Sequence, residues 1–323
     1  MTSILVTGIS GFVGGYFTRY LFNRNTGYEI HGISRSYPEW DFIPEKDEIL
    51  HSVTFHQCDL LDATKVHAII TEIQPDFVLH LASFSSVAQS WKAPAATFLN
   101  NTTAFLNLAE TIRLQGLNTR ILSIGSSEEY GIVPPADLPL AEERSIAPKN
   151  PYAVARVAEE HLAEVYVKGY QIEICRTRSF NHIGPGQSTQ FVVSSIARQF
   201  AEIAIYHKKP VIRIGDGTIV RDFIDVRDVV RAYEAILVKG YPGEVYNVCT
   251  GQKHTILDIV DCLSRLTNIP VTVEQDTGLF RPVDNPVLFG SYEKLRKATG
   301  WAPECSLENS MEKMFEYWCE RVE

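Results

Sequence analysis

Two side chains near the middle of this sequence have the types and the spacing needed for proton transfer. Tyr152 is followed four residues later by Arg156, and in a helix this spacing places the guanidinium on the same face as the phenol. A nearby cation favours the phenolate, so such a tyrosine can exchange its proton closer to neutral pH. This chemistry suits a reaction in which negative charge develops on a carbonyl oxygen, which needs a proton donor and a hydrogen-bond donor.

A glycine triplet near the start of the chain predicts a nucleotide site. Gly8, Gly11 and Gly14 are spaced G-x-x-G-x-x-G directly after the first apolar run, and a predicted helix begins at Phe12. Glycines allow a tight turn and a close approach of backbone to pyrophosphate, and a helix N-terminus favours negative charge. The position at the first strand-to-helix junction favours a dinucleotide site, with Phe12 and Val13 included, over an ordinary turn.

The elements that must position these residues alternate along the first half of the chain. Strands are predicted at 4–7, 29–33, 53–57, 77–81, 120–124 and 172–176, and helices at 12–22, 63–73, 95–115 and 152–168. This alternation predicts an α/β fold, a Rossmann-type doubly wound parallel sheet. The helix 95–115 carries an apolar stripe that we assign to core packing in preference to a second subunit: Phe98, Leu99, Thr102, Phe105, Leu106 and Ala109.

Beyond about residue 180 the elements become shorter and are interrupted by Gly and Pro. We therefore predict an NAD(P)-binding domain over 1–178. Residues 179–323 are predicted to form mainly a smaller, irregular substrate-binding lobe, with segments around 211–250 crossing back to the main sheet.

The end of the second predicted strand bears on the choice of cofactor. An NAD-selective site offers an acidic residue to the ribose there, whereas this chain has Ser34 and Arg35, which suit a 2′-phosphate. We predict NADP(H) as the preferred cofactor, with NAD(H) as the alternative. The ends of the next two strands should also line the cofactor, through Asp59, Leu60, Leu81, Ala82 and Ser83.

Several motifs together carry a resemblance to a known family. The glycine triplet, the segment Ser-Ser-Glu-Glu-Tyr-Gly at 126–131 and the tyrosine that opens the next helix resemble the extended short-chain dehydrogenase/reductase superfamily over essentially the whole chain. The longer segments 178–187, 221–228 and 281–286 resemble its GDP-mannose-modifying branch. This resemblance implies NADPH-dependent reduction of the 4-keto group of GDP-4-keto-6-deoxy-mannose to GDP-rhamnose or an epimeric GDP-6-deoxyhexose.

The resemblance also implies roles for individual side chains. Tyr152 would be the proton donor and Ser126 the hydroxyl that holds the ketone oxygen, and Tyr152 and Arg156 would both contact the cofactor. The family normally has lysine where this chain has Arg156. An arginine keeps the positive charge but cannot relay a proton, because guanidinium stays protonated.

Two other functions stay open, and Glu128 is the reason for the first of them. It falls where related 4,6-dehydratases keep a glutamate base, so a GDP-mannose 4,6-dehydratase is the second interpretation. A carboxylate that only orders its neighbours is the simpler role for Glu128. A third interpretation is a non-catalytic NAD(P)-binding regulator, against which the retention of Ser126 and Tyr152 argues.

A GDP-sugar needs local cations and an apolar pocket. Arginine binds phosphate through paired hydrogen bonds. The resemblance assigns Arg221 and Arg281 to the pyrophosphate, Asn181 to sugar or phosphate, and Phe191 and Val192 to the nucleoside. The remaining predicted substrate contacts are Ser127, Glu128, Arg198 and Arg213.

Composition limits the partners. The net charge of −9 disfavours nucleic acid and anionic membranes, and no apolar run is long enough to span a bilayer. The six cysteines lack metal-ligand spacing, so no metal is expected. We predict a cytoplasmic enzyme, and the family resemblance implies a homodimer.

Overall fold

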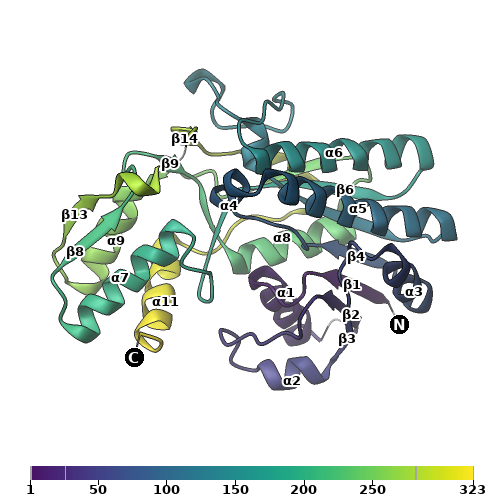
Figure 1. Ribbon diagram of the computed structural model, residues 1–323, viewed down its shortest axis with the longest axis horizontal. Coiled ribbons are helices and arrows are strands. Elements are labelled where there is room, and N and C mark those ends of the chain that lie inside the picture. The colour runs from purple at the N-terminus through teal and green to yellow at the C-terminus, as the bar shows by residue number, and fades with distance from the viewer. Residues whose placement is uncertain (1, 26, 281, 323) are drawn as a thin grey trace.

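The computed structural model describes residues 2–25, 27–280 and 282–322 (Figure 1). At its centre is a seven-stranded sheet in which all pairings are parallel. The predicted fold class, a Rossmann-type parallel α/β sheet, is confirmed. In sheet order the strands are β11 (Val245–Val248), β6 (Ile174–Ser179), β5 (Arg120–Ser126), β4 (Phe77–His80), β1 (Ser3–Thr7), β2 (Glu29–Ser34) and β3 (Val53–Gln57).

Helices cover both faces of this sheet (Figure 1). Alternate residues of β1 explain why: Ile4 and Val6 belong to one apolar cluster and Leu5 to the other, so each face needs a cover. The shorter helices α2 (Lys46–His51) and α4 (Val87–Lys92) lie in the connections. One face carries α1 (Phe12–Asn23), α8 (Val226–Lys239) and α10 (Glu293–Thr299), and the other carries α3 (Ala63–Ile73), α5 (Pro94–Gln115) and α6 (Pro151–Tyr170).

The start of α6 is fixed by local sequence. The side chain of Asn150 accepts a hydrogen bond from the backbone N–H of Ala153 at 2.8 Å, and Pro151 occupies the first helical position, where a missing N–H does no harm. The helix ends at Gln171 in the left-handed conformation. These signals place Tyr152 in the first turn of α6, facing the carboxyl ends of the strands.

The sheet order creates a crevice beside β1. Chain order runs outward on one side through β2 and β3, and on the other through β4, β5 and β6. The loops after β1 and β4 therefore leave the sheet in opposite directions, which opens a crevice at the carboxyl ends of these strands. The glycine turn at Gly8 and the segment at Ser83 form its two sides.

The second half of the chain builds a separate small core and also extends the main sheet. β11 and α8, from the 211–250 region, lie on the main sheet. The predicted boundary after residue 178 stays a prediction. The lobe itself consists of α7 (Val192–Tyr206), α9 (Ile256–Thr267), α11 (Leu307–Cys319), β8 (Val211–Ile214), β13 (Thr272–Gln275) and the short strands β7 (Asn181–Ile183), β9 (Val220–Arg221), β10 (Phe223–Asp225), β12 (His254–Thr255) and β14 (Val287–Leu288).

The apolar stripe of α5 serves two surfaces. Thr102, Phe105 and Ala109 are buried under the sheet, as predicted for core residues. Phe98 and Leu99, in the first turns, are 45% and 57% exposed, so the assignment of the whole stripe to the core is wrong for these two.

Among the helices in the described ranges, none is both long and apolar enough to cross a membrane.

Candidate active site

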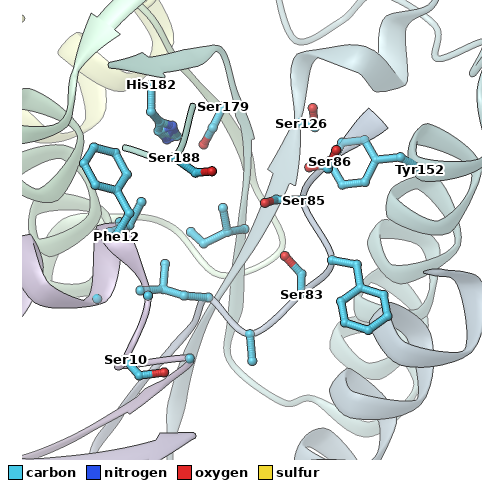
Figure 2. Close-up of a pocket in the computed structure, with 18 of the residues that line it drawn as sticks. Ser10, Phe12, Ser83, Ser85, Ser86, Ser126, Tyr152, Ser179, His182 and Ser188 are labelled. Carbon is cyan, nitrogen blue, oxygen red and sulfur yellow. The ribbon is translucent and has the colours of Figure 1, made fainter. Parts of the chain in front are cut away.

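A cavity of about 730 Å³ opens at the crevice beside β1 and continues towards the lobe. Figure 2 shows side chains from both halves of the chain around it, among them Phe12, Ser83, Ser126, Tyr152 and His182. All of the residues predicted to bind the cofactor line this cavity: Gly8, Gly11, Phe12, Val13, Gly14, Ser34, Arg35, Asp59, Leu60, Leu81, Ala82, Ser83, Tyr152 and Arg156.

The glycine turn has the geometry of a phosphate cradle. Gly8 has φ +70°, and a Cβ there would lie 2.9 Å from the backbone of Ala82, so only glycine lets the loops after β1 and β4 approach this closely. The N-cap residue of α1 is Gly11, which has no side chain that could occupy the N–H groups of the first turn. The first-turn N–H groups of α1 are thus available to an anion, and the turn fits a dinucleotide pyrophosphate.

The end of β2 offers polar groups to the far end of a dinucleotide. The Ser34 hydroxyl donates to the carbonyl of Ser36 at 2.8 Å, which holds this loop in place. Arg35 is exposed, and its guanidinium lies 5.7 Å from the ring centre of Phe84. A guanidinium held over a ring at the cavity edge can pair with a 2′-phosphate.

Ser126 and Tyr152 converge on the same cavity, as Figure 2 shows. The phenol oxygen of Tyr152 accepts a hydrogen bond from Nε of Arg156 at 3.3 Å, and the hydroxyl oxygen of Ser126 accepts one from the N–H of Glu128 at 3.2 Å. Each hydroxyl therefore keeps its own proton for donation to a third group. The arrangement can deliver two hydrogen bonds, one with proton transfer, to a single oxygen.

Arg156 is almost fully enclosed, with 3% of its surface exposed. Besides Tyr152, its guanidinium donates to the Ser83 hydroxyl and, at 2.9 Å, to the carboxylate of Glu159. Burial alone lowers the pKa of the guanidinium, but Tyr152 and Glu159 outweigh this and raise it. Arg156 is accordingly a permanent cation.

Glu128 faces the cavity, where it accepts a hydrogen bond from the Asn150 side chain at 2.9 Å. It lies in a short 3-10 helix, η1 (Ser127–Tyr130). Its neighbour Glu129, which the sequence analysis missed, is fully buried and accepts the N–H of Ser126 at 2.6 Å. Burial and the nearby Glu160 carboxylate raise the pKa of Glu129 well above its usual range. The capping pattern of Ser126 and Glu129 is a local signal that could have found it.

The predicted substrate contacts divide into those that reach the cavity and those that do not. Ser127, Glu128, Asn181 and Phe191 line it. Val192 follows directly, at the start of α7, and is 36% exposed, but it is not part of the lining.

The structure does not bring the predicted arginines together around the cavity. Arg198 pairs with Glu202 at 2.9 Å and Arg213 with Glu274 at 3.2 Å, both on the surface of the lobe. Arg221 is buried and donates to Asp284 and to the carbonyl of Asn285, each at 2.6 Å. Arg281 lies outside the described residues. Arg198 and Arg213 do not line the cavity and each is paired with a carboxylate, so their place in an anion site stays a prediction.

Two histidines near the site are held neutral. His182 lines the cavity, lies 3.1 Å from the Tyr233 hydroxyl, and has its pKa lowered to about 4 by burial. His80, at the end of β4, lies 2.8 Å from the Thr7 hydroxyl; burial and Arg156 lower its pKa to about 3. In the part of the chain that the structure describes, no three His, Cys, Asp or Glu side chains are grouped as metal ligands.

Comparison with known proteins agrees with this geometry. A family described as GDP-mannose 4,6 dehydratase matches residues 5–314. The chain belongs to this family. The predicted resemblance to the GDP-mannose-modifying branch of the extended short-chain dehydrogenases/reductases is therefore confirmed.

Individual members of the GDP-mannose 4,6-dehydratase family include both reductases and dehydratases. GDP-6-deoxy-D-mannose reductase of Pseudomonas aeruginosa is 33% identical over 99% of this chain and 98% of its own length. GDP-mannose 4,6-dehydratase of Yersinia enterocolitica is 27% identical over 97% and 93%. The solved structure of RMD from P. aeruginosa complexed with NADPH has a TM-score of 0.84 at 32% identity, covering 100% of this chain and 99% of its own.

The burial of His80 predicts a specific pH dependence of stability. His80 is neutral in the folded protein down to about pH 3, whereas in the unfolded chain the imidazole takes up a proton near pH 6.5. Protonation therefore favours the unfolded chain, so the stability of the folded protein is fully present above pH 6.5 and falls as the pH drops below it. Between pH 6.5 and pH 4 the free energy of unfolding should fall by about 3 kcal/mol from this group. Urea unfolding at several pH values measures it.

His80→Gln should flatten this part of the pH profile, although it lowers the stability near pH 7 by removing the bond to Thr7. His67→Gln, at an exposed position of α3, is the matched control and should keep the wild-type slope. A wild-type slope in the His80 variant would show that another group carries the pH dependence.

Proposed function

We propose that this protein is an NADPH-dependent reductase that converts the 4-keto group of GDP-4-keto-6-deoxy-mannose to the alcohol, giving GDP-rhamnose or an epimeric GDP-6-deoxyhexose. The observation that carries the proposal is the convergence of Ser126 and Tyr152, 26 positions apart in the sequence, on one cavity with the glycine turn. A full-length relative named GDP-6-deoxy-D-mannose reductase supports the choice of substrate.

The protein's own residues act on the ketone oxygen. NADPH, when bound, supplies a hydride to the carbonyl carbon. Tyr152 donates its phenolic proton to the oxygen, and the Ser126 hydroxyl donates a hydrogen bond that stabilises the charge developing there. Arg156 orders the phenol through Nε and cannot itself give up a proton. The product is a secondary alcohol.

Substrate binding falls to both halves of the chain. In the proposal, Asn181 and Phe191 bind the sugar nucleotide from the lobe side, while Ser127 and Glu128 bind the hexose from the sheet side. Arg221 stays in the proposal as a pyrophosphate ligand, because it is built into the lobe next to the 281–286 motif through Asp284 and Asn285.

A GDP-mannose 4,6-dehydratase is the second candidate function. Glu128 lines the cavity with its carboxylate oriented by Asn150, as a base beside a transient ketone requires, and dehydratases are among the relatives. Such an enzyme converts GDP-mannose without net consumption of cofactor. The higher identity to the reductase favours reduction.

The cellular setting is also a proposal. We infer a homodimer formed through α5 and α6, supported by the exposed apolar residues Phe98, Leu99, Val154 and Val165 on these helices. We infer a cytoplasmic location, supported by six cysteines that are all free thiols.

The reductase proposal predicts the behaviour of a Tyr152→Phe variant. Purified wild-type protein should oxidise NADPH when GDP-4-keto-6-deoxy-mannose is added, followed by the absorbance of the reduced nicotinamide. Loss of the phenolic proton donor should lower kcat on the order of a hundredfold or more with KM little changed.

The same assay separates the two candidate functions. Glu128→Gln should retain reduction, whereas a dehydratase would lose conversion of GDP-mannose, which is measured by product analysis without added NADPH. Wild-type protein that leaves fresh keto-sugar and NADPH unchanged would reject the reductase. Activity of Tyr152→Phe equal to wild type would remove Tyr152 from the mechanism.

Arg35 predicts the cofactor preference. Arg35→Ser removes the cation proposed to pair with the 2′-phosphate, so the Kd for NADPH should rise about tenfold or more while that for NADH stays the same. Fluorescence titration of the reduced cofactors measures both. An equal weakening for the two cofactors would mean that Arg35 only supports the loop. Arg321→Ser, an exposed position just after α11, is the control.

A further inference from the structure

The carboxylate of Glu159 lies directly behind Arg156 and forms an ion pair with its guanidinium. It is 2% exposed and belongs to α6, three residues beyond Arg156. One of its oxygens accepts from Nη1 of Arg156 at 2.9 Å, and the other accepts from the Ser123 hydroxyl of β5 at 2.7 Å. Both oxygens are thus fixed between the helix and the sheet.

This contact also fixes the direction of the guanidinium. With Nη1 held by Glu159, Nε faces the phenol oxygen of Tyr152 at 3.3 Å and Nη2 faces the Ser83 hydroxyl at the cavity wall. A guanidinium is planar, so anchoring one nitrogen determines where the other two point.

We propose that Glu159 is a positioning residue that neutralises Arg156, orients it towards Tyr152 and Ser83, and thereby sets the pH range over which Tyr152 can donate its proton. Its consequence for turnover rests on the proposed reductase function, whereas its effect on the titration of Tyr152 does not.

The need for a fixed anion follows from the arginine itself. A reductase needs the phenol protonated, but an unopposed unit charge about 4 Å away, at an effective dielectric constant near 20, would favour the phenolate by about three pH units. A lysine can release its proton, whereas an arginine cannot. The charge of Arg156 must therefore be balanced by a neighbour, and Glu159 is in contact with it.

The ionisable groups that face this pair from other elements are His80, Glu129 and Tyr233. His80 of β4 lies 4.0 Å from Glu159, and burial lowers its pKa to about 3. Glu129 interacts with Arg156, but burial raises its pKa, and the same holds for Tyr233 of α8. Burial also raises the pKa of the Glu159 carboxyl, while Arg156 and the Ser123 hydroxyl oppose this by stabilising its ionised form.

The test is the titration of Tyr152 in Glu159→Gln, which removes the charge but keeps the shape: the amide oxygen can still accept from Arg156, and the amide NH2 can donate to the Ser123 hydroxyl. The ¹³Cζ resonance of Tyr152 in the full chain without substrate, assigned by its loss in Tyr152→Phe, reports the phenol directly. Its titration midpoint should move to lower pH than in wild type by about one to two pH units. The basic limb of kcat/KM for the keto-sugar, which reports the free enzyme, should move in the same direction.

Two further variants keep the test decisive. Arg156→Gln should move the Tyr152 midpoint to higher pH, and the double variant Arg156→Gln/Glu159→Gln, which has the net charge of wild type and no unpaired buried charge, should return it close to the wild-type value. If Glu159→Gln alone does not fold, the difference between the Tyr152 midpoints of Arg156→Gln and the double variant tests the proposal. Glu164→Gln, farther along α6 and paired with Lys168, should leave both the midpoint and the activity unchanged.

A Tyr152 midpoint that is the same in Glu159→Gln and wild type, or in Arg156→Gln and the double variant, would overturn the proposal. Lower activity without any movement of the basic limb would likewise overturn it, by giving Glu159 a merely structural role. A protein that fails to reduce the keto-sugar but shows the shifted midpoints would reject the reductase function and keep the inference.

Discussion

The buried cation Arg156 is the constraint on which the rest of the site depends. Taking a guanidinium out of water is expensive unless its donors and its charge are both matched. Here three side chains meet that need: Tyr152 and Glu159, which lie on α6 with Arg156 itself, and Ser83, which follows β4. The position of the phenol is thus tied to the position of the charge, and neither can move without leaving a buried group unpaired.

The sheet order explains why these side chains can meet. Strands β4 and β5 are adjacent, so the segment at Ser83 and the serines of β5 emerge next to each other, and α6 returns across both. The reversal of chain order at β1 then leaves the glycine turn on the opposite side of the same crevice. A dinucleotide lying across the crevice would run from the end of β2 to Tyr152, which is the path that the predicted cofactor residues line.

Local sequence patterns predicted most of the helices and strands of the first half, whereas contacts between residues far apart in the sequence explain why the role of Glu159 was missed. The glycine triplet, the Asn150-Pro151 start of α6 and the alternating strands are short-range signals, and all the predicted strands and helices of the first half are present to within a few residues. Glu159 gains its role only from its contact with β5 and from burial, which no spacing reveals, whereas the capping pattern of Ser126 and Glu129 was a local signal that the sequence analysis did not use. The ion pair of Arg213 with Glu274 could not be predicted either, because Glu274 lies on β13, a strand that the sequence analysis did not predict.

Charge balance also explains how an acidic protein can bind an anionic cofactor. Arg178 of β6 is held by Glu160 through two hydrogen bonds of 2.7 and 3.1 Å, just as Arg156 is held by Glu159, so each buried arginine is neutralised where it stands. What can attract an anion at the cavity is the N-terminus of α1 and the exposed Arg35 at its far edge. The attraction for phosphate therefore comes from the N-terminus of α1 and from Arg35, while the guanidinium of Arg156 beside Tyr152 is neutralised by Glu159.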